Sequence, residues 1–557
     1  MRYLLFGILL IALVVSGDQG RKPDAQAFVD AVTAQVAPLS KAMALNYWEA
    51  TATGKQELYT RQGELELQLR KIFADKAGFE QAKALRSDPA VADPLLRRQI
   101  ELLYLSYLEN QIDPKLMERM VTMASAIEGK FNIHRGVFEG KNVADNVLFD
   151  VLKTEKDQAR RKAAWEAAKT VGEVVAPDLL QLVKIRNEAA RQLGFKNYYE
   201  MRMILNEQDP GEIARIFKEL ARVTEAPFLK IKGLVDAAVV KKFGIKPEDI
   251  RPYHYQDFFF QEVQEVGEVD MDAYLKDKDV RKIVEAFYNG IGLPVTDMLD
   301  RSDLYEREGK YQHAYCTDID RQGDVRTMCS LRNNRYWLET LMHELGHGVY
   351  SMNIDRSMPW LVREEAHTFT TEAIAELFGS LPTNPVWLKG AAGIPAKVVD
   401  DWASTLELER KMGLLIFCRW SLVMIDFERE LYANPDQDLN TLWWDLVEKH
   451  QRVKRPEGRN KPDWAAKIHL TSSPVYYHNY MLGNLFASQL LHHMAAKVAR
   501  KGDINNLNFS GDPRLGNYLK EKIFAPGKTW KWDELIRRAT GEPLTPAYFA
   551  GDVTVKQ

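Results

Sequence analysis

Apolar side chains recur every three or four residues along most of this 557-residue chain. That period places them on one face of an α-helix and leaves the intervening charged residues on the other face. The pattern is clearest in four segments: 64–73, 160–193, 212–240 and 403–431. Proline-containing breaks between such segments are typical of turns between helices. We therefore predict a large, mainly α-helical protein.

One stretch departs from the helical pattern. Residues 311–318 and 325–331 are rich in aromatic and β-branched side chains, and the turn-forming residues 320–324 separate them. Two short segments of this kind around a turn predict a β-hairpin. An exposed edge strand of the hairpin can pair with an extended peptide.

The helix pattern that follows the hairpin carries the first candidate chemistry. Its apolar residues repeat every four positions, which predicts a buried helix: Trp337, Leu341, Leu345 and Val349. His343 and His347 of the sequence HELGH lie one turn apart on another face, so both imidazoles can reach one metal ion. Glu344 can act on a metal-bound water. Gly346 costs about 1 kcal/mol relative to alanine in a helix, so we expect another element to pass close to it.

This chain contains 11 histidines. In chains of this length and histidine content, a motif as short as HExxH occurs by chance about once in every hundred. The alternative interpretation is a surface helix with two incidental histidines. The apolar surroundings of HELGH favour a metal site instead.

A catalytic zinc ion has three protein ligands and one open position. Glu372, in the segment TTEAIAE, is the first candidate for the third ligand, on a helix that Thr370 or Thr371 can cap. Glu376 lies one turn further along and can hydrogen-bond a ligand histidine. Two other carboxylates have a compatible spacing: Glu364 and Glu365. Alternatively, Glu372 is an acidic residue that the helix dipole favours near the N-terminus.

Composition argues against a nucleic-acid partner. The formal charge of −3 is close to neutral, and lysine and arginine are dispersed among acidic residues. Such a distribution is typical of a solvated surface. Only three cysteines are present, Cys316, Cys329 and Cys418, so at most one intramolecular disulfide can form.

The first 17 residues have the pattern of a secretion signal. Arg2 precedes an apolar run over residues 3–15, and the small residues Ser16 and Gly17 follow. We expect cleavage after Gly17 and export to the periplasm or the extracellular space. The remaining residues, 18–557, are expected to form one catalytic domain of two helical subdomains. Because the run is shorter than the ~20 residues of a bilayer span, no stable span is expected after signal removal. An uncleaved N-terminal membrane anchor is the alternative.

Six sequence blocks, in this order, resemble the peptidyl-dipeptidase A family of zinc metallopeptidases, whose best-known member is angiotensin-converting enzyme. They are RNEAARQLGFKNYYEMR (186–202), QHAYCTD (312–318), HELGH (343–347), REEAHTFTTEAIAE (363–376), WWDLVEKHQ (443–451) and KIHLTSSPVYYHNYMLG (467–483). The ordered set is specific, and by it the chain is identified as a divergent, bacterial-type member. The resemblance implies a two-lobed helical metallopeptidase with a deep central cleft and the hairpin beside the zinc site.

The resemblance also implies roles for individual residues. One zinc ion per chain would be held by His343, His347 and Glu372, with Glu344 as the catalytic base. Tyr480 resembles the tyrosine that donates a hydrogen bond to the developing oxyanion, and His469 resembles the histidine that assists it. The residues implied around the substrate are His313 and Ala314 along its backbone, and Lys467, Tyr477 and Gln256 around its free C-terminal carboxylate.

Some positions depart from the family pattern. The arginines that bind activating chloride in animal members are replaced by Val447 and by His478 or Asn479, which argues against chloride activation. The stretch SSPVYYHNY holds one residue more than the family stretch, so Tyr476 and Tyr477 are alternatives for one position.

The cysteines depart from the pattern as well. Gln312 stands where the family has a cysteine, so the usual family disulfide cannot form. Cys316 and Cys329 lie on opposite strands of the predicted hairpin and are an alternative pair.

We predict a zinc-dependent peptidyl-dipeptidase that releases dipeptides from peptides with a free C-terminus. The nearest alternative is an oligopeptidase of the thimet oligopeptidase or oligoendopeptidase type, which shares the HExxH motif and a tyrosine-rich block and cuts short peptides internally. An alternative from another class is an inactive zinc-fold binding protein. Loss of Glu344 or of a metal ligand would indicate the inactive class, and neither is lost.

Overall fold

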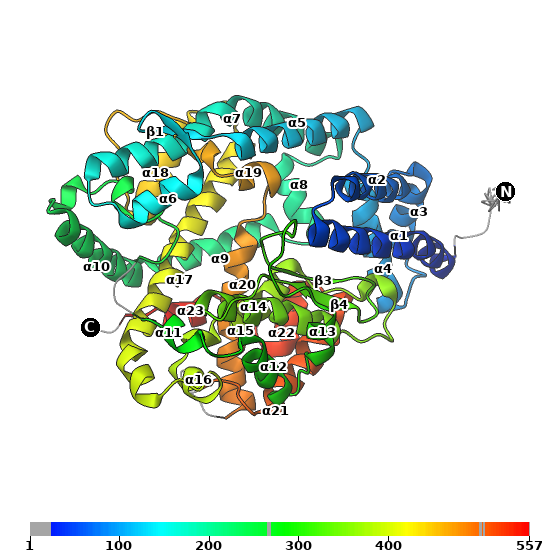
Figure 1. Cartoon of the computed structure of the whole chain (residues 1–557). Coiled ribbons are helices and arrows are strands. Elements are labelled where there is room, and N and C mark those ends of the chain that lie inside the picture. The colour runs from blue at the N-terminus through cyan, green and yellow to red at the C-terminus, as the bar shows by residue number, and fades with distance from the viewer. Residues whose placement is uncertain (1–23, 265–268, 501–503, 505–506, 556–557) are drawn as a thin grey trace, which may run out of the picture.

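The computed structural model describes residues 24–264, 269–500, 504 and 507–555. These residues are mainly α-helical, as the periodicity predicts, and Figure 1 shows two lobes that face each other. Four N-terminal helices lie at one side of the lobes: α1 (Ala25–Thr53), α2 (Gln56–Phe73), α3 (Lys76–Ser87) and α4 (Pro94–Glu109).

The first lobe, uppermost in Figure 1, contains α5 (Pro114–Ile133), α6 (Asp145–Thr154), α7 (Gln158–Gln192), α8 (Tyr198–Leu205), α9 (Pro210–Val223), α10 (Glu225–Phe243), α18 (Leu439–Gln451) and α19 (His469–Ser472). The second lobe contains α11 (Asp272–Leu275), α12 (Val280–Gly290), α13 (Thr296–Arg301), α14 (Arg335–Met352), α15 (Thr368–Gly379), α16 (Pro385–Gly390), α20 (His478–His493), α21 (Pro513–Leu519), α22 (Trp532–Thr540) and α23 (Ala547–Asp552). The long helix α17 (Ala396–Ala433) runs from one lobe to the other.

Three of the four predicted helical segments are parts of single helices, in α2, α7 and α17. The fourth, residues 212–240, is two helices, because α9 ends at Val223 and α10 begins at Glu225. Pro227 explains the interruption. Proline lacks an N–H, and in a continuous helix its ring would clash with the carbonyl group four residues earlier, that of Val223.

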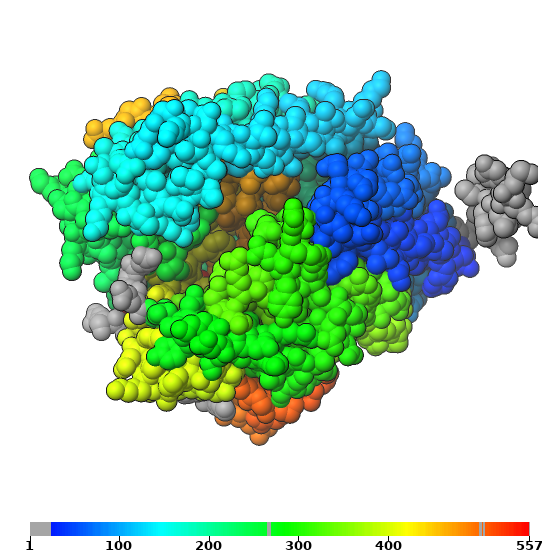
Figure 2. All heavy atoms as spheres, viewed as in Figure 1, coloured from blue at the N-terminus to red at the C-terminus, as the bar shows by residue number. Residues whose placement is uncertain are grey.

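A cleft separates the two lobes. Figure 2 shows a hollow between the second lobe on one side and the first lobe with the N-terminal helices on the other, and the orange C-terminal part of the chain is visible at its floor. The apolar core continues beneath the cleft, since one cluster of buried side chains reaches from Ile112 to Val553. The helices α1 to α4 pack around a cluster of their own, which includes Phe28 and Leu103.

The predicted hairpin is confirmed, with shorter strands. β3 (Tyr315–Asp318) pairs antiparallel with β4 (Val325–Met328), and a second small hairpin joins β1 (Gly136–Phe138) to β2 (Lys141–Val143). In the β3–β4 register Cys316 lies opposite Thr327. Cys316 and Cys329 are free thiols, so the suggested disulfide between them is wrong: the register offsets the two residues along the strands.

The predicted secretion signal, residues 1–17, lies outside the described residues, so its cleavage and the export of the chain stay predictions. Within the part of the chain that the structure describes, every helix is too short or too polar to cross a bilayer.

Candidate metal centre

The two histidines of HELGH lie on α14, which is buried along most of its length. Asn334 caps the first turn, since its side-chain oxygen accepts a hydrogen bond from the Trp337 N–H at 2.9 Å. The four-residue spacing brings the Nε2 atoms of His343 and His347 to 3.3 Å from each other. Both residues line the cleft, so the helix alone presents two nitrogen ligands to one point.

The third candidate ligand lies on α15, which crosses α14 closely. A Cβ atom on Gly346 would lie 2.7 Å from the Cα of Ala375, so only glycine permits this crossing. The expectation that another element passes close to Gly346 is therefore confirmed. α20 also packs closely against α15, since a Cβ on Gly483 would lie 3.0 Å from the Cβ of Glu372. Close packing against α14 and α20 fixes Glu372 relative to the histidines.

α15 begins earlier than predicted. Its N-cap is His367, not Thr370 or Thr371: ring atom Nδ1 accepts a hydrogen bond from the Phe369 N–H at 3.2 Å, and the Thr370 hydroxyl accepts one from the His367 N–H at 3.1 Å. This reciprocal pair satisfies the backbone as a capping box does. Thr371 instead holds a candidate ligand, because its hydroxyl oxygen is 2.8 Å from Nδ1 of His347.

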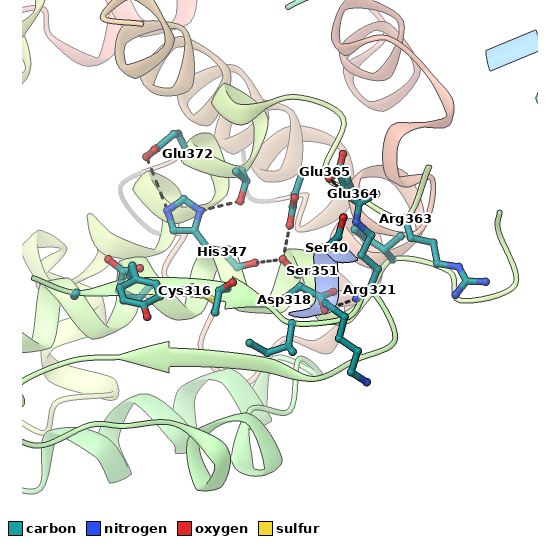
Figure 3. A pocket seen from close by; sticks show the side chains of 18 of the residues that line it. Ser40, Cys316, Asp318, Arg321, His347, Ser351, Arg363, Glu364, Glu365 and Glu372 are labelled. Atoms are coloured by element: carbon teal, nitrogen blue, oxygen red, sulfur yellow. Dashed lines mark hydrogen bonds and ion pairs between the residues drawn. The ribbon is translucent and has the colours of Figure 1, made fainter. Parts of the chain in front are cut away.

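Glu372 completes a three-residue cluster. Its Oε2 atom is 3.8 Å from Nε2 of His343 and 3.9 Å from Nε2 of His347, and one ligand atom from each residue lies within 4.8 Å of the others. Ligands that share one zinc ion at bond lengths of about 2.0–2.2 Å lie roughly 3–4 Å apart, so these residues fit a single ion. Figure 3 shows His347 directed at Glu372. Two imidazoles and one carboxylate leave a fourth position for water.

Side chains beyond the cluster can orient it. Oε1 of Glu376 is 4.0 Å from Nδ1 of His343, as the sequence analysis suggests for a residue one turn after the ligand.

The two alternative ligands have other partners. Glu364 forms ion pairs with Arg321 and with Lys528. Burial alone would raise the pKa of Glu364, but these two cations lower it to about 2. Glu365 accepts a hydrogen bond from the Ser351 hydroxyl. Neither carboxylate belongs to the cluster that contains both histidines, which leaves Glu372 as the candidate.

Glu344 lies beside the candidate metal position and is only 8% exposed. Burial and the charge of Glu372 raise the pKa of Glu344 to about 8, and the backbone N–H of Cys316 in β3 opposes the shift. Glu344 stands outside the three-ligand cluster, so its carboxylate is placed to act on a water and not on the metal.

The family model described as angiotensin-converting enzyme, peptidase family M2, matches residues 20–244 and 263–547 of this chain. The chain belongs to this family. An "angiotensin-converting enzyme-related protein" of Drosophila melanogaster is 20% identical over 298 residues, 52% of this chain and 45% of the relative. An "inactive angiotensin-converting enzyme-related protein" of Caenorhabditis elegans is 28% identical over 139 residues, 24% of this chain and 15% of the relative. The matches thus span less than half the length of either relative.

The two oxyanion candidates of this family member come from neighbouring helices. His469 begins α19 and Tyr480 lies in the first turn of α20, and the ring of Tyr477 packs 5.2 Å from the first and 5.4 Å from the second. Burial and then the charge of Glu372 raise the pKa of Tyr480. Nδ1 of His469 is buried and has no hydrogen-bond partner among the described residues, so it can serve an external group.

The structure adds a candidate to the predicted carboxylate clamp, in which Gln256 stays a prediction. Nζ of Lys467 donates a hydrogen bond at 2.8 Å to Oε1 of Gln261, whereas the backbone N–H of Gln256 donates to the side chain of Gln264. Gln261 takes this position because of Asp257. The buried carboxylate of Asp257 accepts a hydrogen bond from the Gln261 N–H at 3.0 Å and so bends the loop around this carboxylate. The only sequence signal is a second glutamine, five residues after the first.

Tyr477 packs beside this lysine. Its ring centroid is 5.6 Å from Nζ of Lys467, and its hydroxyl accepts a hydrogen bond from Nε1 of Trp420 at 2.6 Å. The hydroxyl proton remains available to a ligand.

The tyrosine-rich block has a backbone kink at Val475. Its φ of 55° lies in the left-handed region, which a β-branched residue rarely adopts. Glu428 of α17 holds this conformation, because its buried carboxylate accepts the Val475 N–H at 2.7 Å. The kink turns Tyr477 into the core and leaves Tyr476 against Tyr480, with ring centroids 5.1 Å apart. No sequence pattern marks a valine in this conformation, so Glu428 was missed.

Replacing Glu428 by glutamine is expected to stabilise the protein at pH 8 but not at pH 4.5. Burial raises the pKa of Glu428 from 4.5 to about 7, although the Val475 N–H and Arg186 oppose the shift. Because the folded state holds this proton more tightly than the unfolded state, the group's contribution to stability is lost as the pH rises from about 4.5 to about 7. Glutamine keeps an oxygen that accepts the hydrogen bond from the Val475 N–H but carries no charge. At pH 8 it therefore avoids a loss of at most about 3 kcal/mol in the free energy of unfolding.

The measurement is the Tm of both proteins at the two pH values. Glu430→Gln, on an exposed position of the same helix, should shift Tm equally at both. A Glu428→Gln protein that melts below the native one at pH 8 would contradict the prediction.

The residues that the family resemblance compares with chloride-binding arginines have uncharged, buried side chains. The side-chain amide of Gln208 joins the two alternatives for one position, since its Nε2 donates to Oδ1 of Asn479 at 2.9 Å and its Oε1 is 2.8 Å from Nε2 of His478. Val447 is buried in the main apolar cluster. Activity without chloride stays a prediction.

The metal position separates two cavities of the cleft. The first, which we name the β3 cavity, has a volume of about 590 Å³ and is lined by β3 and by the segment between α14 and α15. The second, the α17 cavity, has a volume of about 720 Å³ and is lined by α14, α17 and Val263. His343 and Glu344 line both cavities.

The substrate candidates distribute over these two sides. Ala314 lines the β3 cavity. His313 is exposed, with its ring 5.2 Å from that of Tyr311. Lys467 is not among the residues that line either cavity. We assign it to the other side, since its partner Gln261 lies two residues before Val263, which lines the α17 cavity.

Proposed function

We propose that this family member is a zinc-dependent peptidyl-dipeptidase, which removes dipeptides from peptides with a free C-terminus. Lys467 is the observation that carries the proposal. Its ammonium group lies among three aromatic rings, 5.4 Å from the centroid of Phe259, 5.2 Å from that of Trp420 and 5.6 Å from that of Tyr477. It also donates a hydrogen bond to Gln261. Burial lowers the pKa of Lys467 to about 8, against the charges of Asp257 and Glu262, so the group is still a cation at pH 7.

A fixed, desolvated cation on the α17-cavity side gives the substrate's terminal carboxylate a strong partner. Gln261 and the Tyr477 hydroxyl lie next to this cation and can donate to the same carboxylate. Because these groups are packed into the core, they set a fixed separation between the chain terminus and the scissile bond. Such a clamp favours removal of a product of constant length.

Zinc, when bound by His343, His347 and Glu372, would polarise the scissile carbonyl and lower the pKa of water; cobalt and manganese suit the same ligands. The charge of the bound ion would lower the pKa of Glu344 from the value of about 8 that burial and Glu372 give it. The ionised Glu344 accepts the proton of the attacking water and passes it to the nitrogen of the leaving amine. It can serve both steps because its carboxylate is outside the ligand cluster and faces the same space as the water position.

Tyr480 and His469 stabilise the negative charge that develops on the carbonyl oxygen. The raised pKa of Tyr480 keeps its hydroxyl protonated and able to donate. Burial, with the charge of Lys467, lowers the pKa of His469 to about 4, so the ring is neutral at pH 7 and carries a proton on one nitrogen. Preorganised donors of this kind contribute about a hundredfold each to the rate.

The inactive class remains to be tested, since one relative is named inactive. The chain described here has the three candidate ligands, Glu344, Tyr480 and His469 together. That complete set supports catalysis.

A pair of peptides that differ only in a free or amidated C-terminus tests the proposal. The zinc-loaded protein is expected to cut the free peptide at the second bond from its C-terminus, with kcat/KM about 10- to 100-fold above the amidated one. This factor corresponds to one hydrogen bond between charged groups. Lys467→Met should remove the difference. Lys461→Met, an exposed lysine paired with Glu173, should keep it.

Mass spectrometry of the products distinguishes the alternatives. Equal cleavage of both peptides at internal bonds would establish the oligopeptidase alternative. Intact peptides after incubation with folded, zinc-containing protein would establish the inactive alternative.

A further inference from the structure

The β3 cavity contains a carboxylate that the proposed mechanism does not use. Glu365 lies between α14 and α15 and lines this cavity together with His347. The Ser351 hydroxyl donates a hydrogen bond to its Oε1 atom, as Figure 3 shows. Among the described residues, no lysine, arginine or histidine forms an ion pair with Glu365.

The neighbouring carboxylates differ from Glu365 because each has a cation. Glu364 is paired with Arg321 and Lys528, and Asp318 lies 3.5 Å from Nη1 of Arg356. Apart from Glu344 and Glu372 at the candidate metal position, Glu365 is therefore the carboxylate lining this cavity to which the described residues supply no cation.

Arg363 also lines the β3 cavity but does not neutralise Glu365. Its Nε atom donates a hydrogen bond to the carbonyl oxygen of Met358 at 2.6 Å. Figure 3 shows its guanidinium group directed away from Glu365.

An unpaired carboxylate in this position is unfavourable without a ligand. Burial raises the pKa of Glu365, and the nearby charges of Glu364 and Asp318 raise it further. The hydrogen bonds from the Ser351 hydroxyl and from the residue's own N–H act in the opposite direction and lower the pKa. A cation bound in the cavity would restore the missing counter-charge. The volume of about 590 Å³ is typical of ligand pockets and accommodates a long side chain.

The part of a substrate that reaches Glu365 follows from the proposed peptidyl-dipeptidase activity, on which this inference rests. Lys467 would hold the C-terminus on the α17-cavity side of the metal. The residues before the scissile bond then lie on the other side, along β3, whose residues 314–318 line the β3 cavity. We propose that Glu365 selects peptides with a cationic nitrogen on the N-terminal side of the scissile bond.

This nitrogen can come from a lysine or arginine side chain or from the α-ammonium group of a short peptide. N-acetylated peptides with lysine or norleucine at each of the three positions before the scissile bond distinguish the first source. A norleucine peptide with a free amino group tests the second. For one of these cationic peptides, kcat/KM is expected to exceed that of the acetylated norleucine peptide about five- to tenfold, as for a partly desolvated charge pair.

Glu365→Gln should reduce this ratio to about one while cleavage of the acetylated norleucine peptide is kept. Asp324→Asn is the matched control, since Asp324 lies beside β4 in the turn of the β3–β4 hairpin and pairs with Arg326, and neither residue lines the cavity. It removes the same charge and should keep the ratio. A ratio near one in the native protein, or an unchanged ratio in Glu365→Gln, would overturn the proposal.

A binding measurement separates this test from the proposed activity. Calorimetric titration with acetyl-Lys-Lys-Lys and with acetyl-Nle-Nle-Nle needs no cleavage. Tighter binding of the lysine peptide by the native protein and by Asp324→Asn, but not by Glu365→Gln, would support the cation site even if no peptide is cut. Equal binding by all three proteins would reject it.

Discussion

Replacing Glu344 by glutamine is expected to lower kcat by about 10²- to 10⁴-fold, the usual contribution of a general base, while zinc content stays unchanged. Glutamine has nearly the same shape but cannot take a proton from water. Glu344 is outside the cluster formed by the two histidines and Glu372, so its removal leaves the metal ligands in place. The measurements are kcat on a peptide with a free C-terminus and the metal content after dialysis.

Glu339 provides the control for this variant. It lies on the same helix, more than one turn earlier, and forms an ion pair with Arg335. Glu339→Gln is expected to change kcat less than tenfold, because the residue is more than one turn away from the water position. A Glu344→Gln protein that keeps native activity with bound zinc would show that another group accepts the proton.

Replacing Glu372 by alanine is expected to weaken zinc binding more than about a hundredfold and to abolish hydrolysis through loss of the metal. Changes around metal ligands already cost 10- to 100-fold in affinity, and this change removes a ligand. The two histidines remain, but two ligands do not complete a zinc site. The checks are zinc content at graded chelator concentrations and circular dichroism, which should show that α15 still folds.

Two other carboxylates test the assignment of this ligand. Glu376→Ala removes a residue 4.0 Å from His343 and should weaken zinc binding by about tenfold. Glu364→Gln removes the partner of Arg321 and Lys528 and should leave the affinity for zinc unchanged. Native zinc content in Glu372→Ala would instead assign the third ligand to another carboxylate.

Local sequence spacing was sufficient for the features that depend on one helix or one turn. His343 and His347 lie four residues apart, and helix geometry alone brings their nitrogens to one point. The hairpin followed from two short segments around a turn, and Gly346 indicated the close crossing of α15 before its partner was known. These inferences succeed because their geometry is set by neighbours in the chain.

The helical period and the usual capping residues failed where another local feature, or the pairing of two strands, decided the conformation. Residues 212–240 kept a helical period through Pro227, but the chain breaks there into α9 and α10. The cap of α15 is a histidine that reaches its own helix through a side-chain nitrogen. Cys316 and Cys329 seemed paired by position, whereas the strand register, which no residue pattern specifies, separates them.

The sequence by itself determined the candidate metal-binding motif, the candidate catalytic glutamate beside it and, through ordered blocks, the family. Tertiary structure alone decided which side chains surround that motif. Gln261 reaches Lys467 because Asp257 coils a loop, Val475 adopts its kink because Glu428 of a distant helix accepts its N–H, and Glu365 lacks the cations that its neighbour Glu364 has. Each of these three arrangements depends on a contact that the fold creates, either between a side chain and the backbone or between two charges. Such contacts produce no periodic pattern in the sequence.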